Sequence, residues 1–218
     1  MDDGLVAFLM STPSTAAKPP SPEARDYFAL FGFPRKLWIE MNLLEQKFLQ
    51  MSWKLHPDNF VNASEAEREA SLQRSSELND AYRTLREPVA RVEYLLALEG
   101  ARKEGEQKQQ APPELLEEVF ALNESLDELR EAKAAGGDLN ALKMRLESEQ
   151  KNFQEKLTEV DSELFAVAKE WDAAIDAEAN GQAANNAERD AIKQRINKLL
   201  NRRSYIRNLV ANVQKELA

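Results

Sequence analysis

Residues 44–60 read LEQKFLQMSWKLHPDNF, an amphipathic helical pattern that ends at a proline. The apolar residues recur every three or four positions, which places them on one face of a helix. Pro57 pushes the residue before it out of the helical region, so we expect the helix to end near Leu55 and His56 to be extended. His56, Pro57 and Asp58 are therefore expected in the loop that follows. The apolar positions of the helix are Leu44, Phe48, Met51 and Leu55.

Helical patterns also lie on both sides of this segment. Upstream, residues 26–33 read DYFALFGF and predict a short aromatic helix. Downstream, Ser64 and Glu67 form a capping box that starts a helix reaching about Arg86. A short apolar helix over 89–98 follows, and no β-strand is expected in the chain.

The rest of the chain divides into a leader, a linker and a second helical region. Residues 11–22 are small, polar and proline-rich, so residues 1–25 are expected to form a flexible leader. The polar residues 100–112 are expected to form a linker. Beyond them, three long periodic segments are joined by short connections, which predicts an antiparallel three-helix bundle or an elongated coiled-coil-like domain over 113–218. With a first domain at 26–99, the chain is expected to be an all-α protein of two helical domains.

The composition excludes several classes of function. The 218 residues contain no cysteine and one histidine, which excludes disulfides, zinc–thiolate sites, thiol nucleophiles and any site that needs two imidazoles. The net charge of −9 argues against nucleic-acid binding as the main activity. No apolar run approaches the roughly 20 residues of a membrane span. We therefore expect a cytoplasmic protein that is not an enzyme, with no cofactor, no metal site, no nucleic-acid partner and no membrane partner.

Three segments together resemble the J-domain of DnaJ-type co-chaperones and, more narrowly, the HscB proteins of iron–sulfur cluster assembly. These segments are DYFALFGF, the helix with its HPDNF continuation, and SSELNDAYRTLREPVARVEYLL at 75–96. The resemblance covers about residues 26–98 and extends more weakly to 115–129 and to Trp171-Asp172. It implies an L-shaped protein, in which an N-terminal J-domain (an antiparallel helical hairpin with short flanking helices) is followed by the C-terminal three-helix bundle.

The resemblance also implies a chaperone-binding site at the loop. In J-proteins this loop docks on a DnaK/HscA-type chaperone and promotes its ATP hydrolysis. Taken alone, the tripeptide is more typical of an ordinary turn. The lysines of the preceding helix are expected opposite its apolar stripe, and such lysines are equally typical of a solvated surface. Trp53 stands where the family often has a basic residue, so the basic patch is expected to be thinner here and the affinity for the chaperone more apolar in origin. The implied contact residues are His56, Pro57, Asp58, Asn59, Lys47 and Lys54.

A second site is implied on the first helix of the bundle. Leu116 and Phe120 lie about 100° around the helix from the stripe that packs it, close to carboxylates, which suits a protein-binding patch. A wide buried face against the J-domain or a neighbouring helix would explain the same pattern. In HscB proteins this helix binds an IscU-like iron–sulfur scaffold protein, and Leu116, Phe120 and Glu124 stand at matching places. Tyr205 matches a contacting aromatic of the family, although a half-buried bundle tyrosine is the alternative.

The function expected from the resemblance is that of a co-chaperone. It would stimulate the ATPase of a DnaK/HscA-type chaperone and deliver an IscU-like scaffold to it. The alternatives are a J-domain protein with another dedicated client, or a helical adaptor without chaperone activity. Trp171 continues an apolar helical stripe with Val167 and Ile175, so it is expected in the core rather than at a cofactor.

Overall fold

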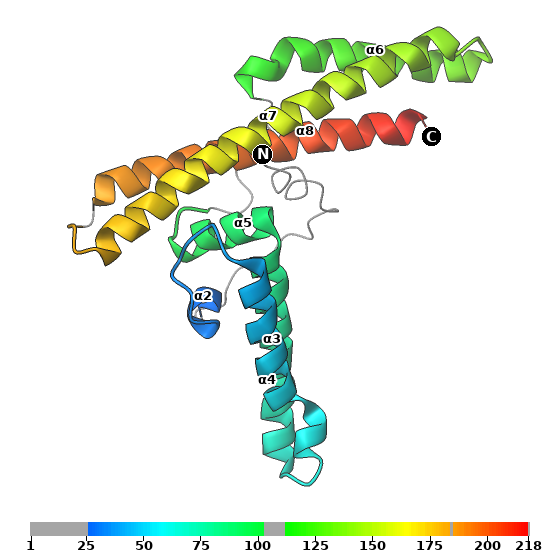
Figure 1. Cartoon of the computed structure of the whole chain (residues 1–218). Helices are drawn as coiled ribbons and strands as arrows, with labels where there is room; N and C mark the ends of the chain where they lie inside the picture. The colour runs from blue at the N-terminus through cyan, green and yellow to red at the C-terminus, as the bar shows by residue number, and fades with distance from the viewer. Residues whose placement is uncertain (1–25, 103–111, 184, 218) are drawn as a thin grey trace. The chain divides into compact units, whose positions relative to one another are not determined.

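The computed structural model describes residues 26–102, 112–183 and 185–217, and these residues are helical throughout apart from their connections (Figure 1). The all-α expectation is confirmed. The expected leader at 1–25 and most of the expected linker lie outside the described residues. The elements, in chain order, are α2 (Tyr27–Leu30), α3 (Met41–Leu55), η1 (Pro57–Phe60), α4 (Glu65–Arg86), α5 (Pro88–Leu98), η2 (Pro113–Leu115), α6 (Leu116–Ala135), α7 (Asn140–Ala179) and α8 (Asn186–Leu217).

The described residues group into two compact units. The first unit contains those of 1–102 together with those of 168–193, and the second contains those of 103–167 and 194–218. Each of the two long helices, α7 and α8, therefore contributes to both units. The domain boundaries expected from the sequence, with one domain at 26–99 and a second at 113–218, remain a prediction.

The first unit is built on a hairpin of α3 and α4, which lie side by side (Figure 1). Leu44 of α3 and Leu78 of α4 are buried, and the rings of Phe48 and Tyr82 stack with their centroids 4.1 Å apart. α3 ends at Leu55 because Pro57 follows, as the sequence predicts.

The start of α4 is closed by the expected capping box. The Ser64 hydroxyl accepts a hydrogen bond from the Glu67 backbone N–H at 3.4 Å, and the Glu67 carboxylate accepts one from the Ser64 N–H at 2.9 Å. These bonds satisfy two backbone donors that the first turn of a helix leaves unpaired. The helix is thereby set to begin immediately after the loop.

α2 and α5 complete the hairpin's core. Phe28 is fully buried, the Tyr27 ring stacks on Tyr94 at 4.4 Å, and the Tyr94 hydroxyl accepts the Tyr27 N–H at 2.9 Å. Burial raises the pKa of Tyr94 to about 12, so it stays neutral. The buried Arg91 donates to the Leu85 carbonyl at 2.7 Å, and burial lowers the pKa of Arg91 to about 10.

The far part of α7 packs on the chain between α2 and α3. Trp171 is fully buried, as expected for a core residue, and its indole N–H donates to the Arg35 carbonyl at 2.8 Å. The Asp172 carboxylate accepts the N–H groups of Leu37 at 2.6 Å and Trp38 at 2.8 Å. Burial raises the pKa of Asp172, while these two donors act in the opposite direction. These bonds explain why residues 168–193 belong to the first unit.

Candidate functional site

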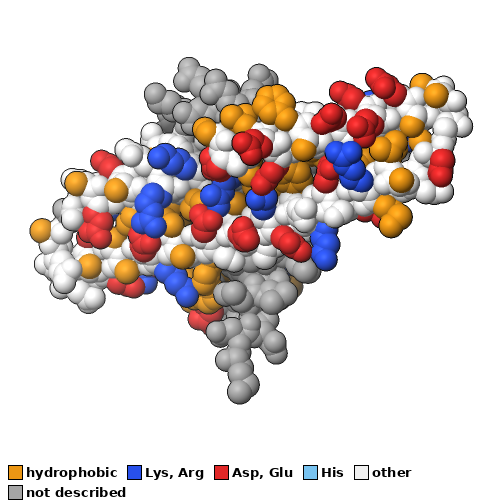
Figure 2. Space-filling model, turned by 90° about the horizontal axis from the view of Figure 1, so that it is seen from above, with side chains coloured by type: hydrophobic (Ala, Val, Ile, Leu, Met, Phe, Trp, Pro, Cys, Tyr) orange, Lys and Arg blue, Asp and Glu red, His pale blue; other side chains and the backbone are white. Residues whose placement is uncertain are grey.

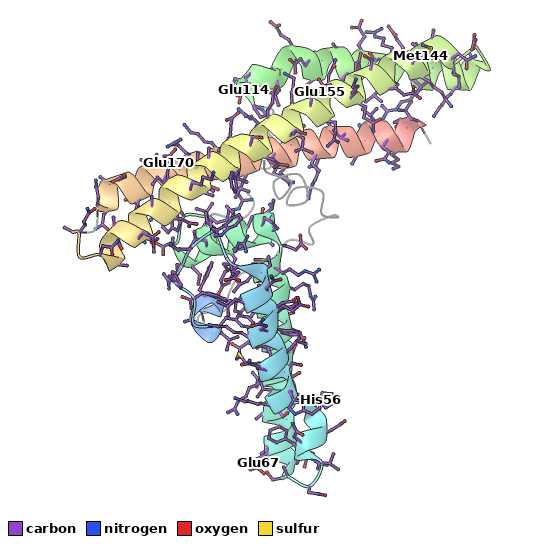
Figure 3. All side chains as sticks on the ribbon, in the orientation of Figure 1. His56, Glu67, Glu114, Met144, Glu155 and Glu170 are labelled. Carbon is purple, nitrogen blue, oxygen red and sulfur yellow. The ribbon has the colours of Figure 1, made fainter. Side chains whose placement is uncertain are left out.

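The loop between α3 and α4 presents its polar side chains to solvent. His56 has the extended conformation that the sequence predicts, with φ −61° and ψ 132°. The 3₁₀ turn η1 then begins at Pro57, which suits a first helical position because proline has no N–H to leave unpaired. Figure 3 labels His56 at the end of the α3–α4 hairpin. The side chains of His56 and Asp58 are 57% and 84% exposed.

Short-range hydrogen bonds order this loop. The Asn59 side-chain amide donates to the Trp53 carbonyl at 2.7 Å, and the Asn59 backbone N–H donates to the His56 carbonyl at 3.0 Å. His56 Nδ1 accepts the Asp58 N–H at 3.3 Å and lies 3.4 Å from the Asp58 carboxylate. An ordered loop with exposed polar groups loses little entropy when a partner binds.

The two lysines of α3 differ in their surroundings. Lys54 is exposed, two residues before His56. Lys47 is half-buried, its ammonium donates to the Phe31 carbonyl at 2.6 Å, and it lies 4.5 Å from the centre of the Phe33 ring. The expectation that Lys47 lies opposite the apolar stripe is therefore wrong. It lies three residues from buried Leu44, on the same side of the helix.

In the second unit, α6 buries one face and exposes another. Its buried residues pack into the bundle, whereas Leu116 is 40% exposed and Phe120 is 71% exposed. Glu124, one turn further along, is also exposed. Within the second unit, Leu116 and Phe120 are therefore not buried against a neighbouring helix. The buried positions of α6 are Val119, Leu122, Ser125, Leu126 and Leu129.

Polar bonds hold α6 to its neighbours along the flanks of the helix. Lys156 of α7 pairs with Glu118 at 3.1 Å, and Glu149 accepts the Ser125 hydroxyl at 2.9 Å. The exposed residues between these flanks include several carboxylates. Figure 2 shows that acidic side chains gather near hydrophobic ones on the face it presents. The exposed acidic residues on the same face of α6 as Leu116 and Phe120 are Glu117, Glu124, Asp127 and Glu131.

Tyr205 lies on α8 near the start of α6. Arg202, one turn earlier, lies 4.0 Å from Glu114 in η2 and also pairs with Glu163 of α7. The Tyr205 side chain is half-buried, as the alternative reading expects. A contact role for Tyr205 remains a prediction.

Sequence reasoning singled out Trp53 but missed the apolar residue one turn before it. Leu49 lies outside the apolar stripe of α3, is 58% exposed and is followed one turn later by Trp53, which is 81% exposed. The available signal was an apolar pair four residues apart on the side of the helix away from its core stripe.

The described residues show neither a metal cluster nor a membrane helix. No group of three or more histidine, cysteine, aspartate or glutamate side chains among them could hold a metal ion. No helix in the described ranges is long and apolar enough to cross a bilayer. The described residues offer exposed surfaces at the His56–Asn59 loop, at Leu49 and Trp53 of α3, and at the face of α6 that carries Leu116 and Phe120.

Comparisons with known proteins identify the family. No protein-family model matches the chain. The co-chaperone protein HscB homologs of Vibrio vulnificus and Vibrio parahaemolyticus are each 34% identical to it over 139 residues, which is 64% of this chain and 80% of theirs. The fold is similar to the crystal structure of human co-chaperone protein HscB, with a TM-score of 0.55 and 22% identity over 94% of this chain and 92% of the human one. With four fifths of these relatives' length matched at this identity, the chain belongs to the HscB family of co-chaperones.

Proposed function

We propose that this co-chaperone stimulates the ATPase of a DnaK/HscA-type chaperone in iron–sulfur cluster assembly. The observation that carries the proposal is the ordered, exposed His-Pro-Asp loop at the end of the α3–α4 hairpin. The loop offers an imidazole and a carboxylate to polar groups of the partner. The residues assigned to chaperone binding are His56, Pro57, Asp58, Asn59 and Lys54, and Lys47 contributes through the 31–33 segment that it contacts.

The loop acts on the partner's conformation. This chain has no glycine-rich phosphate-binding motif, so the nucleotide site belongs to the chaperone. A ligand that prefers one of two conformations shifts the equilibrium towards it by the difference in its affinities. Binding of the His56–Asn59 loop to the hydrolysis-competent conformation is sufficient to raise the ATPase rate, with no catalytic group supplied by the co-chaperone.

The outer face of α6 binds an IscU-like scaffold protein in this proposal. Leu116 and Phe120 supply apolar contact, Glu124 supplies charge, and Tyr205 lies near the start of the same helix. The cluster is cargo held by the scaffold, since this chain contains no cysteine. A chain that holds both partners raises the local concentration of scaffold at the chaperone without any new contact between them.

The scaffold site is tested by the double substitution Leu116→Ala and Phe120→Ala. We expect the affinity for purified IscU-like scaffold, measured by calorimetry, to fall about 100-fold, because two exposed apolar anchors are removed. Circular dichroism should be unchanged, because neither side chain is part of the core. Met144→Ala is the matched control, since Met144 lies in the same unit and is 71% exposed, as Phe120 is.

Two outcomes separate the alternatives. A double variant that binds the scaffold as the wild type does would refute the α6 site. A wild-type chain that stimulates the chaperone but does not bind the scaffold would indicate a J-domain protein with another client.

A further inference from the structure

The outer face of α3, the side away from its buried stripe, carries no charge. Its residues follow helical spacing and are exposed, yet this face bears only amide and apolar side chains, although 31% of the whole chain is charged. Leu49 and Trp53 stand one turn apart on it and are 58% and 81% exposed. The residues of this outer face are Asn42, Gln46, Leu49, Gln50 and Trp53.

The fold does not account for this face. The core side of α3 is filled by Leu44 and by the stack of Phe48 on Tyr82. A tryptophan that is 81% exposed contributes little to that core. Clustered exposed apolar side chains on a soluble protein are typical of binding surfaces, and tryptophan is enriched among the residues that dominate binding energy.

The outer face is continuous with the His56–Asn59 loop. Trp53 lies three residues before His56, and the Asn59 side chain bonds to the Trp53 carbonyl at 2.7 Å. A partner seated on the loop therefore meets the last turns of α3 as well. This continuity points to the chaperone as the occupant of the face.

The charges of α3 support an apolar contact over an electrostatic one. Within Met41–Leu55, all of which the structure describes, the charged residues are Glu45, Lys47 and Lys54. The Lys47 ammonium is already bonded to the Phe31 carbonyl, so Lys54 is the exposed cation nearest the loop in this helix. One exposed cation gives little long-range attraction to an acidic partner.

We infer that Trp53, assisted by Leu49, is an apolar anchor that sets the affinity for the chaperone, while the His56–Asn59 loop sets the stimulation of its ATPase. The inference rests on the proposed function. It assigns the chaperone an apolar surface, flanked by groups that the amides of Gln46 and Gln50 can meet. Association through such a contact depends weakly on salt.

The test measures ATP hydrolysis by the purified Hsp70-class chaperone of the same organism against increasing co-chaperone. Trp53→Ala should raise the half-stimulating concentration about tenfold or more, and Leu49→Ala about threefold, with maximal stimulation unchanged. Trp53→Phe should restore most of the affinity because an aromatic ring is kept. Leu72→Ala is the matched control for Leu49→Ala and should behave as wild type, because Leu72 of α4 is 57% exposed.

Salt dependence gives a second readout. Between about 50 and about 300 mM KCl, the wild-type half-stimulating concentration should change less than about threefold. A tenfold change of the wild-type half-stimulating concentration over this salt range would overturn the inference. So would a wild-type half-stimulating concentration in Trp53→Ala. If Trp53→Ala lowers the midpoint of thermal unfolding of the co-chaperone, the comparison of Leu49→Ala with Leu72→Ala alone decides whether the outer face of α3 binds the chaperone.

Failure of the inference is distinguishable from failure of the proposed function. If Trp53→Ala keeps the wild-type affinity for the chaperone and Asp58→Asn does not stimulate its ATPase, only the role of Trp53 as an anchor is refuted. A wild-type chain that does not stimulate the chaperone at any concentration overturns the proposed function and the anchor with it.

Discussion

Asp58→Asn is expected to abolish stimulation of the chaperone ATPase while leaving the co-chaperone folded. The Asp58 side chain is 84% exposed, so its charge contributes little to the stability of the loop. Asparagine keeps the size of the side chain but removes the negative charge that a partner's cation or N–H would meet. Loss of one member of a close charged pair at an interface typically costs about 2–5 kcal/mol, which is about 30-fold or more in the equilibrium.

The measurement is single-turnover hydrolysis of ATP by the chaperone with saturating co-chaperone. His56→Gln should behave in the same way, because the imidazole is the other exposed polar group of the loop. Asp80→Asn makes the same chemical change on α4, where Asp80 lies 3.7 Å from Arg83 on the surface, and it should stimulate as the wild type does. Wild-type stimulation by Asp58→Asn would show that the loop is an ordinary turn and would favour a helical adaptor.

Trp171→Ala is expected to destabilise the first unit by about 3–5 kcal/mol, the usual cost of deleting a fully buried large aromatic side chain. Trp171 is fully buried, donates to the Arg35 carbonyl at 2.8 Å, and has the Arg189 guanidinium 5.0 Å from its ring centre. Its removal leaves a cavity and an unpaired backbone carbonyl beside the Asp172 bonds.

Urea unfolding followed by circular dichroism measures this effect. Trp53→Ala is the matched control, because it deletes the same side chain from an 81% exposed position and should change the unfolding free energy by less than about 1 kcal/mol. Equal destabilisation by the two substitutions would contradict the structural account of the α7 end as part of the first core.

Local features of the first unit could be predicted from the sequence because they depend on neighbouring residues. A proline two residues after Leu55 ends α3, and the Ser64–Glu67 pair starts α4. The burial of Leu44 and of Trp171 follows from helical spacing alone. The loop motif in the context of these helices was sufficient to indicate the HscB family, which the 34% identical relatives confirm.

Features that depend on distant residues could not be predicted in this way. The ammonium of Lys47 bonds to a carbonyl in the turn after α2, sixteen residues earlier in the chain. Asp172 accepts two backbone N–H groups from a segment about 135 residues away, and nothing in its own surroundings indicates those partners. Such contacts form only when the tertiary packing is known.

The candidate scaffold site on α6 could be predicted from the sequence only in part. Helical spacing placed Leu116 and Phe120 on a flank of α6, but spacing alone permitted either a binding patch or a wide buried face. The exposure of Phe120 shows that no helix of the second unit covers it, and this depends on where the helices of that unit pack. The uncharged face around Trp53 likewise required the exposed fractions of individual side chains.

A mixing experiment tests most directly whether one chain must hold both partners. Asp58→Asn keeps the scaffold face, and Leu116→Ala/Phe120→Ala keeps the loop, so the mixture contains every contact but on separate molecules. With chaperone, scaffold and ATP present, we expect the mixture to hydrolyse ATP no faster than Leu116→Ala/Phe120→Ala alone, and the wild type to exceed both. A mixture that reaches the wild-type rate would contradict the account, because the two surfaces would then not need to share a chain.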